Sequence, residues 1–323
     1  MNRFLSAFAP KLEDMLEYRT ARGYKEKSYL PALTKFDKFC LANFSNTDEL
    51  TSEVVHSWLD VEISEESSLA APATVIRQLG KYLAAVGENA YILPERFTPK
   101  QSKFTPHIFT DTELSSLFYE IDKLEPTKRE PFISEIAPVL FRLIYTCGLR
   151  PNEGRTIEHT NVNLDTGELL ISNTKRAKER IVVMSDDMLN MCRAYDVTRN
   201  IFGGNSIYFF PANDGETFTG AHIKNMFAKA WTKAVCSAKN PVPRSIRVYD
   251  LRHQFASVCL NRWLDERRDL MVMLPYLRAY MGHDKLSETA YYIHLLPENL
   301  VKTSAIDWAA FNSLLPEVSV CPS

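Results

Sequence analysis

The sequence Met281-Gly-His-Asp-Lys-Leu-Ser-Glu-Thr-Ala-Tyr-Tyr-Ile-His294 places a tyrosine nine residues after a histidine, and two distant arginines complete the set. Phosphoryl transfer spreads negative charge over the nonbridging oxygens of its transition state, so it needs fixed cationic donors around them. Arg150 and Arg252 suit this task, because a guanidinium group binds two phosphate oxygens and stays protonated. Tyr292 suits the role of nucleophile, because a phenol leaves more readily than an alkyl hydroxyl and keeps the covalent ester reversible. These residues predict cleavage and rejoining of a phosphodiester without ATP.

Helices are predicted around this stretch. We expect Pro275 to begin a short helix that Gly282 ends, and Ser287 to begin the next one. Adjacent residues of a helix point about 100° apart, so only one of Tyr291 and Tyr292 can face the site, and Tyr291 is then a packing residue. An apolar stripe predicts a further helix upstream, and its members are Leu251, Phe255, Val258, Cys259 and Trp263.

The segment that leads to the first arginine predicts the start of a domain. Thr110-Asp-Thr-Glu113 forms a capping box that begins a helix. Another helix follows Pro131, and Gly148 ends it through a left-handed residue, so Arg150 lies just past this end. Both arginines are thus expected at the ends of elements, where a ligand can reach their side chains.

A β-hairpin is predicted between the two arginines. Residues 169–172 and 180–183 are short β-rich runs on either side of a basic turn, which places Lys175 near the tip. Residues 206–210 form a third possible strand, and Thr219 caps a helix after it. The fold class is therefore mainly α with a small β-sheet (α+β).

The N-terminal part of the chain predicts a helical bundle. Its apolar residues recur at helical spacing, as in Phe8, Leu12, Met15 and Leu16, in Leu33, Phe36, Cys40 and Phe44, in Val54 and Trp58, and in Val75, Ile76, Leu79 and Leu83. Three prolines without apolar periodicity indicate a linker over residues 94–109. We divide the chain into a helical domain 1–93, this linker, a second domain 110–300 and an amphipathic tail 301–323.

Composition sets the broad class of protein. The 323 residues, of which 45% are hydrophobic, suffice for two domains with buried cores. The six cysteines contain no C-x-x-C pair, which indicates neither a zinc site nor a disulfide framework. No signal pattern opens the chain and no apolar run approaches the roughly 18 residues that cross a bilayer, so we expect a cytoplasmic protein.

The charge distribution is compatible with binding to DNA. The formal net charge is -2, but residues 175–252 hold thirteen Lys and Arg against seven Asp and Glu, a difference of +6. Residues 1–100 hold twelve against fourteen. A local basic excess permits contacts with phosphates even where the whole chain is acidic.

Three sequence boxes, in this order, resemble those of the tyrosine recombinase (phage integrase) family. The first arginine box is similar to Cys147-Gly-Leu-Arg150-Pro-Asn-Glu153, the H-x-x-R box to Tyr249-Asp-Leu-Arg252-His253, and the last box to Gly282-His283 through Tyr292. The resemblance implies an N-terminal helical core-binding (SAM-like) domain that binds DNA and a C-terminal catalytic domain. The two domains would close around duplex DNA.

The resemblance also implies roles for the residues of the first box and the hairpin. Arg150 and Arg252 would clamp the scissile phosphate, and Glu153 would orient the arginine, although an ordinary acid at a helix N-terminus is a rival interpretation. Lys175 resembles the hairpin lysine that protonates the leaving 5′ oxygen, and Lys178 is its competitor. The basic residues of this turn that we expect to contact DNA are Arg176, Lys178 and Arg180.

The last two boxes imply the remaining roles. His283 would donate to a phosphate oxygen or help the nucleophile to lose its proton, and Tyr292 would be that nucleophile. Tyr249 departs from the family, which usually has histidine there; a phenol can donate a hydrogen bond but is neither a cation nor a near-neutral base. Activity is therefore expected in weakened or altered form. His253 is expected to point elsewhere on its helix and to buttress the site.

The resemblance finally implies the reaction and the partners. It implies a 3′-phosphotyrosine intermediate on double-stranded DNA recombination sites, with a homotetramer on two duplexes, in the nucleoid and not at a membrane. No metal and no cofactor are implied, because the arginines replace the charge of a metal. The tail 301–323 would dock on the neighbouring subunit or pack on its own domain. Integration, excision or transposition of a mobile element is the preferred role.

Three alternatives stay open from the sequence. Tyr249 leaves open a DNA-binding relative with weak or no strand exchange. A type IB topoisomerase would use the same residue types to relax supercoils without a second duplex. A purely helical interaction protein with accidental motif matches is the third, although the motifs agree with the helices and strands predicted around them.

Overall fold

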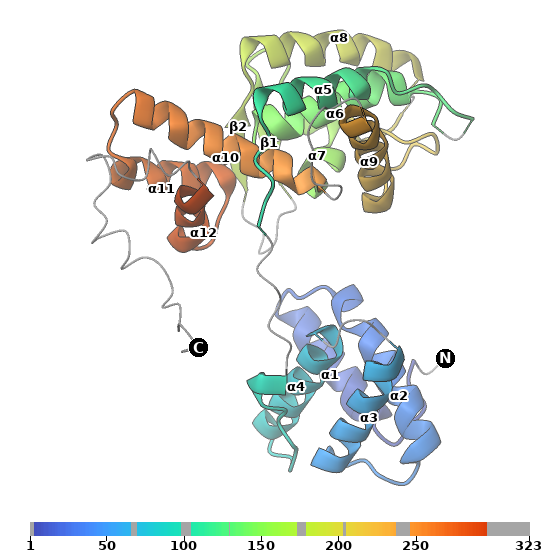
Figure 1. The fold of residues 1–323 in the computed structure, drawn as a ribbon. Helices are drawn as coiled ribbons and strands as arrows, with labels where there is room; N and C mark the ends of the chain where they lie inside the picture. The colour runs from blue at the N-terminus through green and yellow to red at the C-terminus, as the bar shows by residue number, and fades with distance from the viewer. Residues whose placement is uncertain are drawn as a thin grey trace. The chain divides into compact units, whose positions relative to one another are not determined.

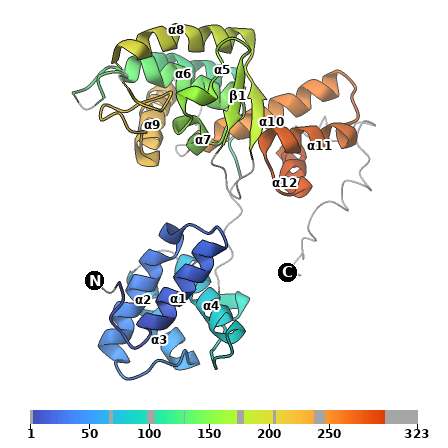
Figure 2. The same cartoon turned by 180° about the vertical axis from the view of Figure 1, so that it is seen from behind.

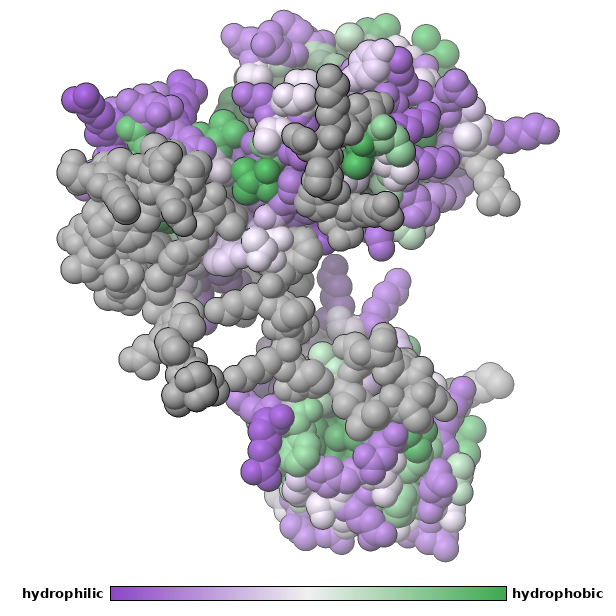
Figure 3. Space-filling model, in the orientation of Figure 1, coloured by the Kyte–Doolittle hydropathy of each residue, from purple (hydrophilic) through white to green (hydrophobic). Residues whose placement is uncertain are grey.

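The computed structural model describes residues 3–65, 70–97, 105–128, 130–172, 179–202, 205–236 and 246–295. The chain divides into two compact units, residues 1–104 (unit 1) and 105–323 (unit 2), and we describe each by itself. Their boundary falls within the segment 94–109 that was predicted as a linker. Among the residues that Figure 3 colours by hydropathy, hydrophilic ones surround separate hydrophobic spots on both units. None of the helices in these ranges has the length and apolar character that crossing a membrane requires.

Unit 1 is, over its described residues, a bundle of α-helices (Figure 1), as predicted. The helices are α1 (Ala9–Ala21), α2 (Leu30–Asn43), α3 (Ser52–Glu65) and α4 (Ala70–Ala85), and the short 3-10 turns are η1 (Glu26–Ser28) and η2 (Glu95–Phe97). The core forms from the apolar residues at helical spacing, and in it Phe36 packs edge-on against Phe8 and Trp58. Asp37 fixes the chain before α1, because its carboxylate accepts hydrogen bonds from the backbone N–H groups of Leu5 and Ser6.

Unit 2 contains two groups of helices and a hairpin. The first group is α5 (Asp111–Asp122), α6 (Ile133–Thr146), α7 (Pro151–Arg155), α8 (Asp186–Phe202) and α9 (Gly220–Cys236), with the 3-10 turn η3 (His159–Asn161). The second group is α10 (Val248–Asp265), α11 (Leu270–Met281), α12 (Leu286–Ala290) and the 3-10 turn η5 (Tyr291–Leu295). The first group forms one hydrophobic cluster together with Val248 and Leu251 of α10, and the second group forms another. The predicted capping box begins α5, because Thr110 and Glu113 each accept a hydrogen bond from the other's backbone N–H.

The hairpin consists of β1 (Glu168–Ile171) and β2 (Arg180–Val183), which pair antiparallel with Leu169 opposite Val182. These two residues are buried while their neighbours Leu170 and Ile181 are exposed, so one face of the hairpin covers the core. Figures 1 and 2 show it between the two groups of helices. The predicted hairpin is thus confirmed, and its tip, residues 173–178, lies outside the described residues.

The strand predicted for residues 206–210 is wrong. Tyr208 makes only an isolated antiparallel bridge to Glu158. The Ile207 carbonyl accepts a backbone hydrogen bond from His159, but three other carbonyl groups of this segment are bound by side chains of α8. Arg199 donates to Ser206 and Tyr208, and the Tyr195 hydroxyl donates to the Phe209 carbonyl. Side chains that occupy the carbonyl groups of a segment leave no room for a neighbouring strand.

Two predictions for the second group of helices need correction. Helix α11 begins at Leu270 and not at Pro275, because the carboxylate of Asp269 accepts a hydrogen bond from the backbone N–H of Met271 and caps the helix earlier. Gly282 ends α11 with φ 65°, as predicted. The apolar stripe of α10 is only partly a core face, since Val258 is 42% exposed. Its members Phe255, Cys259 and Trp263, with Tyr276 and Tyr280 of α11, line an open groove, the aromatic pocket.

Candidate active site

Two glycine turns bring the residues of the boxes together. Gly148 follows α6 with φ 58°, and a Cβ added there would lie 2.4 Å from the ring of Phe255, so only glycine fits between α6 and α10. Arg150 comes directly after this turn and caps α7. Gly282 makes the equivalent left-handed turn after α11, and His283 follows it. Arg252 lies in the first turns of α10, and its side chain contacts the carbonyl groups of Gly148 and Met281 at the two turns.

Arg252 joins these turns from a fully buried position. Its Nη1 donates to the carbonyl oxygen of Gly148 at 2.6 Å, and its Nη2 donates to that of Met281 at 2.5 Å. Its Nε has no hydrogen-bond partner among the described residues. The side chain is 0% exposed, whereas the sequence predicted that a ligand could reach it. The carbonyl groups that hold its Nη atoms draw the arginine inward, which is the physical reason for this correction.

Arg150 is the more accessible arginine. Its side chain is 31% exposed, its Nη1 donates to Glu153 Oε1 at 2.7 Å, and its Nη2 donates to the Gly282 carbonyl at 2.7 Å. The backbone N–H of Arg150 also donates to Glu153 Oε2. Glu153 therefore holds both the backbone and the side chain of Arg150, and this arginine connects the first box to the last.

Glu153 is the centre of a buried ion-pair network. Besides Arg150, it binds Arg180 in a two-pronged pair, with Nη1 to Oε1 at 3.0 Å and Nη2 to Oε2 at 2.7 Å, and Nη1 of Arg252 lies 4.0 Å away. Burial alone would raise the pKa of Glu153, but the hydrogen bonds and charges of Arg180 and Arg150 lower it to about 2. This carboxylate therefore stays ionised and offsets the charge of the surrounding guanidinium groups.

Arg180 has contacts that the sequence did not indicate. Its side chain is only 10% exposed, and its Nε donates to the carbonyl oxygen of Tyr280 at 2.8 Å. We therefore propose that Arg180 supports Glu153, in place of the DNA contact expected from the sequence. The other basic residues of the turn, Lys175, Arg176 and Lys178, lie outside the described residues.

Tyr292 belongs to the second hydrophobic cluster of unit 2. It is 2% exposed, and its hydroxyl oxygen lies 3.1 Å from Nδ1 of His253, in hydrogen-bond contact. Burial raises the pKa of this phenol, although the charges of Arg252 and Arg150 oppose the effect. Tyr292 is thus a protonated phenol next to both arginines. Tyr291 is half-buried beside it, with the two ring centroids 6.3 Å apart.

His283 stacks on the nucleophile candidate. Its ring is nearly parallel to that of Tyr292, at 19° and 6.0 Å between centroids, and its Nδ1 lies 2.8 Å from Thr289 Oγ1. Burial and then the charges of Arg252 and Arg150 lower the pKa of His283 to about 3, so this imidazole is neutral. Thr289 was not singled out from the sequence, although it is the threonine of Gly-His-x-x-Leu-Ser-x-Thr.

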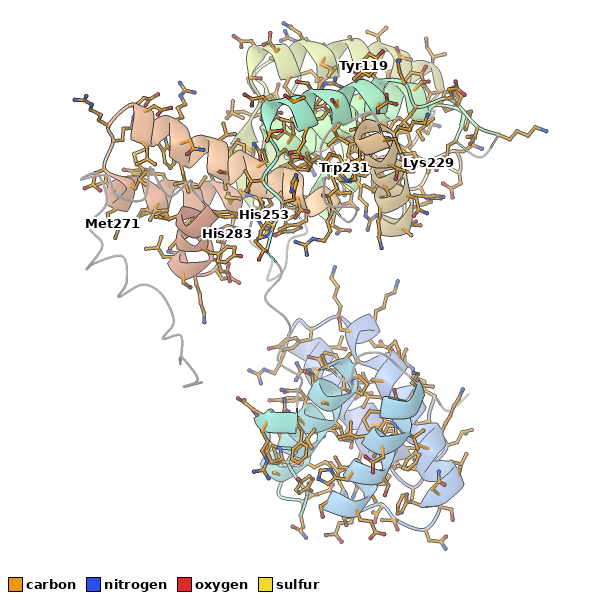
Figure 4. The ribbon with its side chains drawn as sticks, viewed as in Figure 1. Tyr119, Lys229, Trp231, His253, Met271 and His283 are labelled. Carbon is orange, nitrogen blue, oxygen red and sulfur yellow. The ribbon has the colours of Figure 1, made fainter. Side chains whose placement is uncertain are left out.

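Tyr249 and His253 share one face of α10. They are four residues apart, and their ring centroids are 5.0 Å apart. The Tyr249 phenol raises the pKa of Arg150, Arg252 and Tyr292, so it lies in the same cluster. His253 was expected to point elsewhere on its helix, but it contacts Tyr292. Figure 4 shows His253 and His283 beside each other, where α10 meets the turn after α11.

The cluster has the parts of a phosphoryl-transfer site. It joins the guanidinium groups of Arg150 and Arg252, the phenols of Tyr249 and Tyr292, two neutral imidazoles and a carboxylate that fixes the cations. Over the residues that the structure describes, no group of His, Cys, Asp and Glu could hold a metal ion. Guanidinium groups are suited to stabilise the charge that develops on phosphate oxygens, and a phenol oxygen is suited to attack phosphorus.

Known proteins resemble this chain over most of its length. Residues 110–299 match the phage integrase family. The putative integrase/recombinase y4rE of Sinorhizobium fredii is 26% identical over 299 residues, which cover 91% of this chain and 93% of the relative. The Tn1549 transposon integrase in complex with transposon right end DNA is similar in fold, with a TM-score of 0.63, 14% identity, and coverage of 96% and 99% of the two chains. A lambda integrase tetramer bound to a Holliday junction has a TM-score of 0.59 at 13% identity, with coverage of 88% and 76%.

Proposed function

The chain belongs to the phage integrase family, and from this we propose that it is a site-specific DNA recombinase that cuts and rejoins strands through a 3′-phosphotyrosine intermediate. One observation carries the proposal. Arg150, Arg252 and Tyr292 come from three separate segments of the chain and converge in one cluster, where both arginines act on the pKa of the phenol. This arrangement supports the roles of Tyr292 as nucleophile and of the two arginines as phosphate ligands.

The proposed reaction assigns one step to each side chain. Arg150 and Arg252 bind the nonbridging oxygens of the scissile phosphate, and Glu153 keeps their guanidinium groups in place. Tyr292 attacks phosphorus and displaces the 5′ oxygen, which leaves a 3′-phosphotyrosine and a free 5′ hydroxyl. This hydroxyl attacks the phosphotyrosine of the partner duplex and releases the tyrosine there. Lys175 is the proposed acid for the 5′ oxygen, with Lys178 as its competitor. Tyr249 donates a hydrogen bond to a phosphate oxygen where the family usually has histidine.

DNA must displace side chains before this reaction begins. Arg252 is fully buried, but the carbonyl groups of Gly148 and Met281 use only two of its five N–H donors, so Nε and the second N–H of each Nη can bind phosphate oxygens. Arg150, which is partly exposed, offers the first contact. We propose that the phosphate enters along Arg150 and moves Tyr249 aside to reach Arg252.

The preferred biological role is the movement of a mobile element by integration, excision or transposition. The similarity to a putative integrase/recombinase and to a transposon integrase supports this preference. The partner is then double-stranded DNA with inverted recombination sites, which Arg176 and Lys178 of the hairpin turn contact through the backbone. A DNA-binding relative with weak strand exchange is the second candidate, and the observation that favours it is Tyr249 in the H-x-x-R box.

The test uses inverted repeats from the DNA that flanks the gene. In a nicked suicide duplex made from these repeats, cleavage releases a short fragment that carries the free 5′ hydroxyl and diffuses away. Rejoining is then impossible, so an enzyme that cleaves the duplex stays covalently attached to it. The wild-type chain is expected to form this adduct and, with two intact sites, recombinant product. Binding without an adduct would indicate the second candidate. Relaxation of supercoils without recombinant product would indicate a topoisomerase.

The working form is proposed to be a tetramer on two duplexes, because exchange of four strands needs four tyrosines. We propose that residues 301–323 of one subunit occupy the aromatic pocket of its neighbour. The tail carries apolar residues at helical spacing, Trp308, Phe311 and Leu315, and they match a pocket lined by Phe255 and Trp263. Figure 2 shows α10 and α11, which form this pocket, from behind.

Deletion of residues 301–323 is expected to prevent the formation of tetramers on DNA while the chain still binds a single site. Trp263→Glu should weaken tetramers about 30-fold, since loss of a buried aromatic anchor has an effect of this size. Sedimentation of the protein mixed with two-site DNA measures both. Val197→Glu is the matched control, because Val197 is 69% exposed on α8 and away from the pocket. Unchanged tetramers in the shortened chain would show that the tail packs on its own domain.

A further inference from the structure

His253 is in direct contact with the reacting oxygen of the proposed nucleophile. Nδ1 of His253 and the hydroxyl oxygen of Tyr292 are 3.1 Å apart, and the two ring centroids are 5.4 Å apart. The two residues are 39 positions apart in the chain and meet because η5 packs against α10. A hydrogen bond of this length is within the range in which a general base takes a proton.

We propose that His253 is the base that removes the phenolic proton of Tyr292 during DNA cleavage; this inference rests on the proposed function. The O–H bond of Tyr292 breaks and its proton moves to Nδ1 of His253, while the phenolic oxygen forms a bond to phosphorus. The bond from phosphorus to the 5′ oxygen breaks, and that oxygen takes a proton from the general acid. In rejoining, the 5′ hydroxyl returns its proton to that acid, and the imidazolium of His253 returns its own to Tyr292.

The other groups of the cluster are poorer acceptors. Arg150 and Arg252 stay protonated and cannot take a proton. Tyr249, at the position of the family's usual histidine, carries a phenol, which is no better a base than Tyr292 itself. His283 presents the face of its ring to Tyr292, and its Nδ1 bonds to Thr289. His253 directs a ring nitrogen at the phenol of Tyr292. It lies one helical turn after Tyr249, which occupies the position of the family's usual histidine.

The surroundings of His253 keep its imidazole unprotonated before the reaction. Burial, followed by the charges of Arg247 and Arg252, lowers the pKa of His253 to about 4, so it is neutral near pH 7. The groups that face it are Tyr249 of α10, His283 after α11 and Tyr292 of η5. A bound phosphodiester adds negative charge that favours the imidazolium. The phenolic proton also becomes more acidic as the oxygen bonds to phosphorus, so transfer accompanies attack.

His253→Asn is the variant that separates a base from a merely positioning residue. The amide oxygen of asparagine can accept the hydrogen bond near the place of Nδ1, but it cannot take up the proton. We expect its rate of cleavage of the suicide duplex to fall by about 10²- to 10⁴-fold, the usual contribution of general base catalysis. The rate should then rise about tenfold per pH unit in alkaline solution, since hydroxide must ionise the phenol, while the wild-type rate stays nearly constant.

A duplex with sulfur in place of the bridging 5′ oxygen shows whether a variant impairs protonation of the leaving group or activation of the nucleophile. A thiolate leaves without a proton, so sulfur should restore cleavage by Lys175→Ala but not by His253→Asn. His222→Asn is the matched control, because His222 is half-exposed on α9 and should leave the rate unchanged. Duplex binding by the same preparations checks that His253→Asn is folded. Nitrogen NMR of labelled histidine in the wild-type chain is independent of any variant, and it should find Nδ1 of His253 without a proton.

The outcomes separate this inference from the proposed function. A wild-type chain that forms no adduct overturns the proposed function and this role with it. If the wild-type chain cleaves the duplex, any of three results overturns the role of His253 alone. They are cleavage by His253→Asn at the wild-type rate or faster, recovery of the His253→Asn rate on the sulfur duplex, and a proton on Nδ1 of His253 in the NMR spectrum. Faster cleavage would mean that His253 holds Tyr292 in a resting position.

Discussion

Tyr292→Phe is expected to abolish the covalent adduct with a nicked suicide duplex, because the substitution removes the oxygen that attacks phosphorus. The phenyl ring still fills its place in the cluster of α10, α11 and η5, where the tyrosine is 2% exposed. The variant loses the hydrogen bond to His253, a change of about 1 kcal/mol in the free energy of unfolding. Denaturing gels with end-labelled DNA measure the adduct, and mobility shifts should show that duplex binding is kept.

Tyr291→Phe is the matched control for this prediction. It makes the same chemical change at the adjacent residue, whose ring lies beside that of Tyr292. The adduct should form at the wild-type level. An adduct that persists in Tyr292→Phe and disappears in Tyr291→Phe would transfer the role of nucleophile to the neighbour and would contradict the alignment of the last box.

Local patterns explain which parts of the fold were predictable. The capping box at Thr110 and the glycine stops at Gly148 and Gly282 depend on residues within a few positions, and all three are present. The segment 206–210 has the composition of a strand, but its carbonyl groups accept hydrogen bonds from Arg199 and Tyr195 of α8. No local pattern reveals such contacts. Helix α11 begins before the predicted Pro275, because the Asp269 side chain caps it and the proline lies inside the helix.

For the site too, the sequence predicted which residues take part but not which contacts their side chains make. The boxes predicted which residues gather, since Arg150, Arg252 and Tyr292 do lie together. They did not predict the direction of each side chain, which depends on how α10 packs against the turns around it. Three examples are the burial of Arg252, the pair of Arg180 with Glu153 across 27 positions, and the contact of His253 with Tyr292.

Glu153→Gln is expected to destabilise unit 2 by about 3 kcal/mol at neutral pH, because removing one partner of a buried ion pair leaves buried charge without compensation. The glutamine side chain has the same shape, but its amide group would direct N–H donors at the N–H donors of Arg150 or Arg180. The charge that offsets these guanidinium groups is also lost. Calorimetry of the full chain measures the effect as a shift in the unfolding transition of unit 2.

Glu266→Gln is the matched control for the ion-pair network. Glu266 also has two arginine partners in unit 2, Arg262 and Arg268, but all three side chains are more exposed than Glu153. Solvent screens exposed pairs, so this change should leave the unfolding transition nearly unaltered. Equal shifts in the two variants would mean that burial of Glu153 contributes nothing.

The pH dependence of stability gives a second measurement of the same network. The pKa of Glu153 is lowered from 4.5 to about 2, so its contribution to stability is fully present above pH 4.5 and is lost as the pH falls towards about 2. The destabilisation caused by Glu153→Gln should therefore be constant from neutral pH down to about pH 5 and should shrink below it. His253 and His283 are present in both chains, so the difference between the chains isolates the carboxylate. A difference that stays constant down to the acid limit would mean that Glu153 has the same pKa in the folded and unfolded chain, and that its arginine partners do not stabilise its charge.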